Sequence, residues 1–209
     1  MQLRRSLWWW YPLVIPVQVI TDTLSRYRPV LVEPLEGHAA VALIVDTARS
    51  TQDPEIVFIE RATHQGDPWS GHVAFPGGRC ESEDPGPSAT AMRETREEIG
   101  VDLSAGHLLG RLDDLQGRRS HQLVVSCFVY VLNGTGPFQL NYEVADVLAL
   151  PVSRLLDPIH WTEVHYQAWG GMVFPGINLG EGDERVIWGL TYRFLERFFT
   201  LLGYTLPTS

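Results

Sequence analysis

The chain has 209 residues, of which 44% are hydrophobic and 20% charged, so it is long enough to bury one sizeable core and one main domain is expected. Its formal net charge of −9 argues against a sequence-independent nucleic-acid binder, because such proteins need basic surface to displace counterions from phosphates. All sixteen basic residues are arginines, which excludes a lysine-dependent phosphate loop and Schiff-base chemistry. A metal ion must therefore help if the substrate carries phosphate.

The N-terminal stretch has two open interpretations. Arg4 and Arg5 precede an apolar run over residues 7–20, as in a weak signal peptide. Two prolines and a glutamine interrupt this run, no small-residue cleavage site follows it, and it is too short to span a membrane. We therefore favour a packed N-terminal arm with a short helix over residues 1–37. Its tryptophan-rich part, residues 8–11, leaves a homodimer open.

The only two cysteines are Cys80 and Cys127, which lie in different contexts and lack metal-ligand spacing. This usage suits a reducing compartment better than a disulfide scaffold. We predict free thiols, a cytoplasmic location and no membrane partner.

The first part of the chain predicts one helix and three strands. Residues 21–27 favour a short helix that ends before Pro29. Residues 39–45 and 55–59 are apolar, β-branched runs separated by a polar stretch, which is the pattern of a β-hairpin. Residues 72–75 indicate a third, brief strand.

Residues 87–99 form the clearest predicted helix, because apolar side chains recur at helical spacing between Pro87 and Gly100. Further strands are predicted over residues 107–112, 122–132 and 147–150, and an amphipathic helix over residues 183–202. Together these elements predict an α/β fold, with helices flanking a mixed β-sheet, over a domain of residues 38–205.

Three glutamates share one face of the predicted helix. Glu94, Glu97 and Glu98 lie at positions i, i+3 and i+4, within about 6 Å of one another along the axis. Like charges so close repel, whereas a divalent cation turns the repulsion into coordination by hard oxygen ligands. Mg²⁺ is the expected ion and Mn²⁺ its substitute. The alternative is a solvated acidic face paired with Arg93 and Arg96.

The residues upstream favour the metal site. The string FPGG over residues 75–78 ends a strand and adds two glycines, which let the backbone turn sharply and approach a bound phosphate. From residue 75 to residue 101 the chain resembles the Nudix box, the loop–helix signature of Nudix hydrolases. Asp84 stands where glutamate is usual, and one extra residue precedes Arg93. This combination is similar to the coenzyme A pyrophosphatase branch, and the likeness covers residues 38 to about 200.

The resemblance implies a Nudix-like α/β/α sandwich and a hydrolase that cleaves a phosphoanhydride bond in a nucleoside-diphosphate-linked substrate. It implies that Glu94, Glu97 and Glu98 bind Mg²⁺ and that Arg93 orients them through an ion pair. For Gly77 and Gly78 it implies a loop shaped around the substrate. Asp84 either contributes near the metal ion or stabilises the loop, and Glu81 and Glu83 remain open as solvated charges.

Hydrolysis of a diphosphate needs a metal ion that neutralises phosphoryl oxygens and lowers the pKa of a water molecule, and a carboxylate that removes the proton. Glu97 and Glu98 are the first candidates for this base. Glu143 is the second, because a later loop glutamate serves as base or ligand in some relatives. A plain loop charge is an equally open interpretation of Glu143.

Arg61 and His72 are the candidate substrate-binding side chains. Arg61 matches a position that is often arginine in the coenzyme A branch, and His72 either contacts a phosphate or base or is structural. Where that branch usually carries His-x-Gly-Gln or His-x-Gly-Glu, residues 69–72 read Trp-Ser-Gly-His. Trp69 either stacks on an adenine or packs the loop. Arg118 and Arg119 either grip terminal phosphates or lie at a hairpin tip.

The rival function is a catalytically silent Nudix-fold module that binds a nucleotide without cleaving it. Such modules commonly lose a box carboxylate, whereas this chain keeps all three glutamates. The hydrolase is therefore favoured, with a small nucleotide diphosphate as its partner and the identity of that diphosphate open.

Overall fold

The structure, a computed structural model, describes residues 13–34, 37–64, 66, 69–116, 123–166, 171–180 and 182–208. The tryptophan-rich residues 8–11 and the arginines at positions 118 and 119 lie outside the described residues. Within the described ranges, no helix is both long and apolar enough to cross a membrane.

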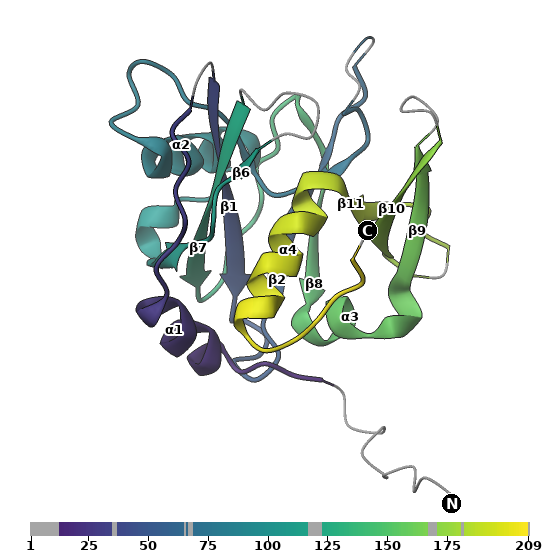
Figure 1. The fold of residues 1–209 in the computed structure, drawn as a ribbon. Helices are drawn as coiled ribbons and strands as arrows, with labels where there is room; N and C mark the ends of the chain where they lie inside the picture. Colours follow the sequence, from purple (N-terminus) through teal and green to yellow (C-terminus); the bar gives the residue numbers. More distant parts are fainter. Residues whose placement is uncertain are drawn as a thin grey trace, which may run out of the picture.

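A mixed eight-stranded sheet forms the centre of the molecule (Figure 1). Its middle strands, β1 (Gly37–Asp46) and β7 (Leu123–Leu132), pair in parallel along their whole length. Strand β2 (Glu55–Arg61) pairs antiparallel with β1, which confirms the predicted hairpin. The other strands are β3 (Val73–Ala74), β4 (Gly77–Arg79), β5 (His107–Arg111), β6 (Leu115–Gln116) and β8 (Val144–Pro151).

Helices cover both faces of this sheet because its central strands are apolar on both sides. In β1, Leu43 packs into one buried cluster and Ala42 and Ile44 into the other. The first cluster lies under α1 (Val17–Arg26), α3 (Val152–Leu156) and α4 (Gly189–Leu201), and the second lies under α2 (Pro87–Ile99). The predicted arrangement of helices around a mixed sheet is confirmed.

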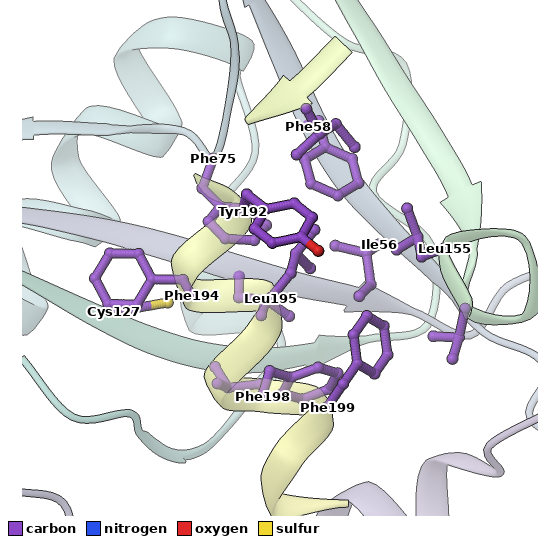
Figure 2. Close-up of a cluster of buried hydrophobic side chains, with 14 of the residues drawn as sticks. Ile56, Phe58, Phe75, Cys127, Leu155, Tyr192, Phe194, Leu195, Phe198 and Phe199 are labelled. Atoms are coloured by element: carbon purple, nitrogen blue, oxygen red, sulfur yellow. The ribbon is translucent and has the colours of Figure 1, made fainter. Parts of the chain in front are cut away.

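The larger cluster is rich in aromatic side chains, several of which come from α4 (Figure 2). Phe194, Phe198 and Phe199 of α4 are almost fully buried. Phe58 of β2 stacks on Phe75, with ring centroids 5.2 Å apart. Phe75 directly precedes the glycine loop, so the core fixes the start of that loop.

A second, three-stranded sheet was not predicted. It contains β9 (Trp161–Tyr166), β10 (Met172–Asn178) and β11 (Val186–Trp188) in antiparallel order. The prediction of one helix over residues 183–202 was wrong in its first part. Val186 and Ile187 pair with Asn178 and Ile177 of β10, and Gly189, at φ +66°, lets the chain turn from the strand into α4.

Other boundaries moved by a few residues. Helix α1 begins at Val17, because Pro16 precedes it with a fixed φ and Ile20 and Leu24 bury one face. Strand β8 extends beyond the predicted residues 147–150 at both ends, from Val144 to Pro151. Two short 3₁₀ helices, η1 (Leu103–Ala105) and η2 (Pro158–His160), complete the described elements.

Candidate active site

The site begins at the paired glycines of the FPGG string. Both belong to β4, which pairs antiparallel with β1. Gly77 has φ +149°, and a Cβ atom there would collide with the backbone of Ala40 and Val41. A Cβ atom on Gly78 would collide with the Glu94 carboxylate. Gly77 therefore needs glycine to lie against the sheet, whereas a side chain at Gly78 would push the Glu94 carboxylate away from the loop.

Helix α2 holds the three glutamates at graded depths. It begins at Pro87 and ends at Gly100, whose φ of +74° suits the left-handed helix end. The Glu98 residue is only 2% exposed, whereas the side chains of Glu94 and Glu97 are 16% and 56% exposed. The helix thus presents one buried, one partly buried and one exposed carboxylate along the same edge.

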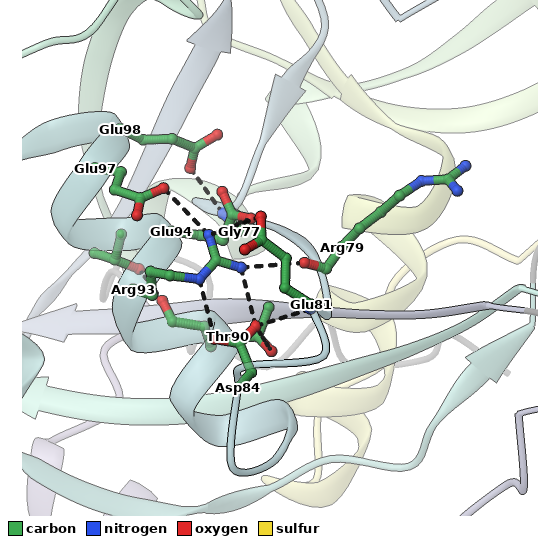
Figure 3. Close-up of polar contacts among 11 residues, drawn as sticks. Gly77, Arg79, Glu81, Asp84, Thr90, Arg93, Glu94, Glu97 and Glu98 are labelled. Atoms are coloured by element: carbon green, nitrogen blue, oxygen red, sulfur yellow. Dashed lines mark hydrogen bonds and ion pairs between the residues drawn. The ribbon is translucent and has the colours of Figure 1, made fainter.

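Arg93 connects the helix to the loop before it (Figure 3). Its Nη1 donates to Glu94 Oε1 at 3.0 Å and to Glu97 Oε2 at 3.2 Å. Its Nε and Nη2 donate to the two carboxylate oxygens of Asp84, each at 3.0 Å, and Nη2 also reaches the Arg79 carbonyl at 3.2 Å. One guanidinium therefore orients two of the glutamates and anchors the loop.

The Asp84 carboxylate makes its hydrogen bonds within the loop and the helix that follows it. Besides Arg93, its Oδ2 accepts hydrogen bonds from the Thr90 hydroxyl at 2.8 Å and from the Glu81 amide at 3.0 Å. The Arg93 guanidinium contributes most to holding the pKa of Asp84 far below its usual range, and the Glu81 amide and the Thr90 hydroxyl contribute less. Of the two roles left open for Asp84, these contacts support loop stabilisation.

Glu98 is the most perturbed carboxyl of the site. Its Oε2 accepts the Gly77 amide at 2.8 Å, and its side chain is otherwise enclosed by protein. Burial raises the pKa of Glu98 to about 8, and the nearby charge of Glu94 adds to this, although the Gly77 amide and Arg61 favour the ionised form. Burial likewise raises the pKa of Glu94. Burial thus disfavours the ionised form of both glutamates, and a cation bound beside them would favour it.

A cavity of about 330 Å³ opens over these carboxylates. The loop that carries Glu143 forms one wall, because the amides of Gln139 and Asn141 donate to the carbonyls at the end of α2, at 2.9 and 3.0 Å. The Ala62 amide donates to the Glu143 carbonyl at 2.7 Å, which ties the same loop to the end of β2. These bonds position Glu143 beside the helix, far from it in sequence.

The cavity collects almost all of the predicted site residues. Its lining includes Arg61, Gly77, Gly78, Arg93, Glu94, Glu97, Glu98 and Glu143. His72 lies outside it and lines a neighbouring cavity. Four further residues line the site that sequence reasoning did not assign to it: Arg79, Glu81, Asn141 and Tyr142. Arg79 and Glu81 lie within the string that resembles the box, whereas Asn141 and Tyr142 become neighbours through the fold.

The donor chemistry fits a hard divalent cation. Five glutamates line the cavity and every side-chain carboxylate is an oxygen donor, the type that Mg²⁺ and Mn²⁺ prefer. Among the residues that the structure describes, no three His, Cys, Asp or Glu side chains are already arranged around one point. The reason is local: Arg93 Nη1 bridges Glu94 and Glu97, while Glu98 binds the Gly77 amide. The exposed Glu97 side chain has room to turn toward a cation.

Comparison with known proteins gives consistent matches. The NUDIX domain family matches residues 37–169. The protein named uncharacterized Nudix hydrolase NudL from Yersinia enterocolitica is 29% identical over 189 residues, which cover 86% of this chain and 91% of that protein. The human mitochondrial coenzyme A diphosphatase NUDT8 is 31% identical over 171 residues, 79% of this chain and 70% of that protein. The crystal structure of a MutT/nudix family protein from Enterococcus faecalis has the same fold, with a TM-score of 0.54, 13% identity, and coverage of 90% of this chain and 69% of that one.

Proposed function

The chain belongs to the Nudix family and is a Nudix-type pyrophosphohydrolase, and from this premise we propose that it cleaves a nucleoside-diphosphate-linked small molecule with Mg²⁺ bound by Glu94, Glu97 and Glu98. The main support for this proposal is the charge of the cavity. Five glutamates and three arginines line it, so its formal charge is negative when all are ionised. A diphosphate, itself an anion, needs a cation to bind there.

A bound divalent cation would supply neutralisation of the phosphoryl oxygens and a water of lowered pKa. The protein's own part is orientation. Arg93 fixes Glu94 and Glu97, and the glycine loop brings backbone close to the phosphates. Arg61 lines the cavity and offers a guanidinium to phosphate oxygens. Glu98, Glu97 and Glu143 all border the same space, and one of them removes the proton from the attacking water.

The substrate we favour is coenzyme A or a similar adenosine diphosphate conjugate. Two relatives, the human and the mouse NUDT8 proteins, are named coenzyme A diphosphatases, at 31% and 29% identity. The Trp-Ser-Gly-His segment before the glycine loop departs from that branch, so related nucleotides must be tested beside coenzyme A.

The test is a substrate screen with purified protein and MgCl₂. Coenzyme A, ADP-ribose, nucleotide sugars and dinucleoside polyphosphates are incubated with the protein, and products are assigned by mass spectrometry. We expect Mg²⁺-dependent release of a nucleoside 5′-phosphate, which for coenzyme A also carries the 3′-phosphate of the substrate, together with the second phosphate-bearing product, and we expect loss of release in EDTA and recovery with Mn²⁺. Stoichiometric ligand binding without any product would instead identify a silent nucleotide-binding module.

Two further parts of the proposal concern where and in what form the chain acts. We place it in the cytoplasm, since both cysteines are free thiols, although the NUDT8 relatives are named mitochondrial. For the oligomeric form, a homodimer is the state to be tested against a monomer. Cell fractionation and light scattering coupled to size exclusion test these two points.

A further inference from the structure

A second cavity lies beside the carboxylate cavity. Its volume is about 310 Å³, close to the lower end of the usual range for small-molecule sites. It is lined by Gly71, His72, Val164, Glu184, Arg185, Val186 and Trp188, and we call it the aromatic recess. None of the glutamates of helix α2 lines it.

Aromatic rings form one side of the recess. The Trp188 ring lies 4.8 Å from the His72 ring and 4.9 Å from the Tyr166 ring, measured between centroids. Trp69, which is 44% exposed, meets the edge of His72 at 5.6 Å. His72 and Trp188 are the two of these rings that line the recess, and they give it a flat, polarisable surface.

Arg185 and Glu184 form the polar part of the lining. Arg185 donates to Asp183, to Glu60 of β2 at 2.9 Å and to Asp146 of β8 at 2.7 Å. These bonds tie the segment before β11 to the main sheet, so the recess keeps its shape without a ligand. Because three carboxylates already surround its guanidinium, Arg185 serves as a wall and is not available as a phosphate ligand. Glu184 beside it is exposed and offers a hydrogen-bond acceptor.

The two cavities share a boundary one residue pair wide. Arg61 lines the carboxylate cavity, and Gly71 and His72 line the recess. The Arg61 amide donates to the His72 carbonyl and the Gly71 amide donates to the Arg61 carbonyl, both at 3.0 Å. Paired residues of neighbouring strands lie about 5 Å apart. A ligand with its diphosphate over α2 can therefore reach the recess with its next group.

From this arrangement we propose that the aromatic recess binds the nucleobase of the substrate, an assignment that rests on the proposed function of the adjoining cavity. A base has flat π faces for ring walls and ring-edge donors for an acceptor such as Glu184. A purely aliphatic group would leave the polar wall unused. Trp188 and His72 are then specificity residues for the hydrolase, at a site separate from the metal-binding carboxylates.

The test compares AMP with ribose 5-phosphate, which differ in the presence of the base. Calorimetric titration in MgCl₂ should show that the wild-type protein binds AMP about tenfold or more tightly, because stacking on an aromatic side chain contributes roughly that factor. Trp188→Leu removes the ring and should bring the two affinities together without changing that for ribose 5-phosphate.

A second variant tests the recess without replacing Trp188, which also packs against other rings. Val164→Phe fills the recess from β9 and should abolish the same preference while Trp188 stays in place. Leu108→Ala, at a 51% exposed position on β5, is the control and should keep the full preference. Thermal unfolding checks that each variant is folded.

Equal wild-type affinities for AMP and ribose 5-phosphate, or an undiminished preference in folded Trp188→Leu and Val164→Phe, would overturn the assignment of the recess. This test can fail or succeed independently of the test for hydrolase activity. A base preference lost in both variants supports the recess even if no diphosphate is cleaved, whereas cleavage without any base preference removes the recess and leaves the hydrolase intact.

Discussion

Two arginines of this protein each bind several carboxylates, yet they serve different regions. Arg93 binds Glu81, Asp84, Glu94 and Glu97, all from one loop and the helix that follows it. Arg185 binds Asp183, Glu60 and Asp146, which come from three segments far apart in the chain. The first arginine orients side chains within one local motif, and the second holds two sheets together.

The surroundings explain why only one of these clusters is a candidate metal site. Beyond the contacts of Arg93, Glu98 and Glu143 add carboxylates to the same cavity and leave it with excess negative charge. Around Arg185 the neighbours in the recess are rings and apolar side chains, with Glu184 the one further acid of its lining. An arginine that binds several carboxylates thus does not identify a catalytic site; the unbalanced carboxylates next to it do.

The largest expected effect follows from removing one charge at the buried end of the first cluster. Glu98→Gln keeps an acceptor for the Gly77 amide, so the fold should persist, but the metal ligand and candidate base is lost. We expect turnover to fall by about 10³-fold or more. Steady-state rates at saturating Mg²⁺ measure this, with Glu163→Gln, an exposed position on β9, as the control. Near-wild-type turnover in Glu98→Gln would remove Glu98 from the mechanism.

Arg93→Lys should have the next largest effect. Lysine keeps the charge but cannot bind Asp84 through two nitrogens while reaching both glutamates. We expect turnover to fall about 10–100-fold and the Mg²⁺ requirement to rise, because the metal-binding carboxylates lose their orientation. Arg96→Lys, an exposed position on the same helix, should change neither quantity. An Arg93→Lys enzyme with an unchanged Mg²⁺ dependence would show that the ion pair has only a structural role.

The stability of the metal-free protein should depend on pH through Glu98. Its pKa rises from 4.5 when unfolded to about 8 when folded, so the folded state keeps a proton that the unfolded state releases. The stabilising contribution is complete below pH 4.5 and is lost as the pH rises toward 8, by roughly 1–3 kcal/mol. Urea unfolding in EDTA at several pH values should show this fall in the wild type and a smaller one in Glu98→Gln. Identical pH dependence in both proteins would contradict the assignment.

Breaking the second cluster should change stability more than chemistry. Arg185→Gln removes a cation from among three carboxylates, and its partial exposure screens the loss, so we expect about 1–2 kcal/mol less free energy of unfolding. The recess loses a fixed wall, so KM for the nucleoside-diphosphate-linked substrate should rise while kcat changes by less than about threefold. Arg28→Gln, an exposed arginine outside both clusters, is the control for charge. A kcat loss as large as that of Arg93→Lys would erase the distinction between the two clusters.

The same contrast explains what the sequence could predict. Helix α2 was predicted to the residue, because Pro87 and Gly100 mark its ends and its spacing is local. The hairpin of β1 and β2 was predicted from two apolar runs. Strand β10 was not predicted, because Pro175 and Gly176 interrupt its apolar pattern. Strand β9 was also not predicted, although its sequence has the alternation typical of a strand: the exposed Glu163 and His165 alternate with less exposed neighbours.

Residues joined only by the fold could not be assigned from sequence alone. Glu143 was named through a family resemblance, and its place beside α2 depends on backbone bonds of the loop before it. Asn141 and Tyr142 enter the cavity with it and had no signal of their own. The contacts of Arg185 with Glu60 and Asp146 span 125 and 39 residues, distances over which sequence spacing says nothing.

The central claim is that the carboxylates of helix α2 hold a divalent cation, and anomalous diffraction from crystals grown with Mn²⁺ tests it most directly. We predict a manganese peak bound by carboxylate oxygens of Glu94, Glu97 and Glu98, with the exposed Glu97 side chain turned toward the ion and Arg93 still bound to Asp84 and Glu94. Crystals grown with saturating Mn²⁺ that show no peak in this cavity would contradict the account.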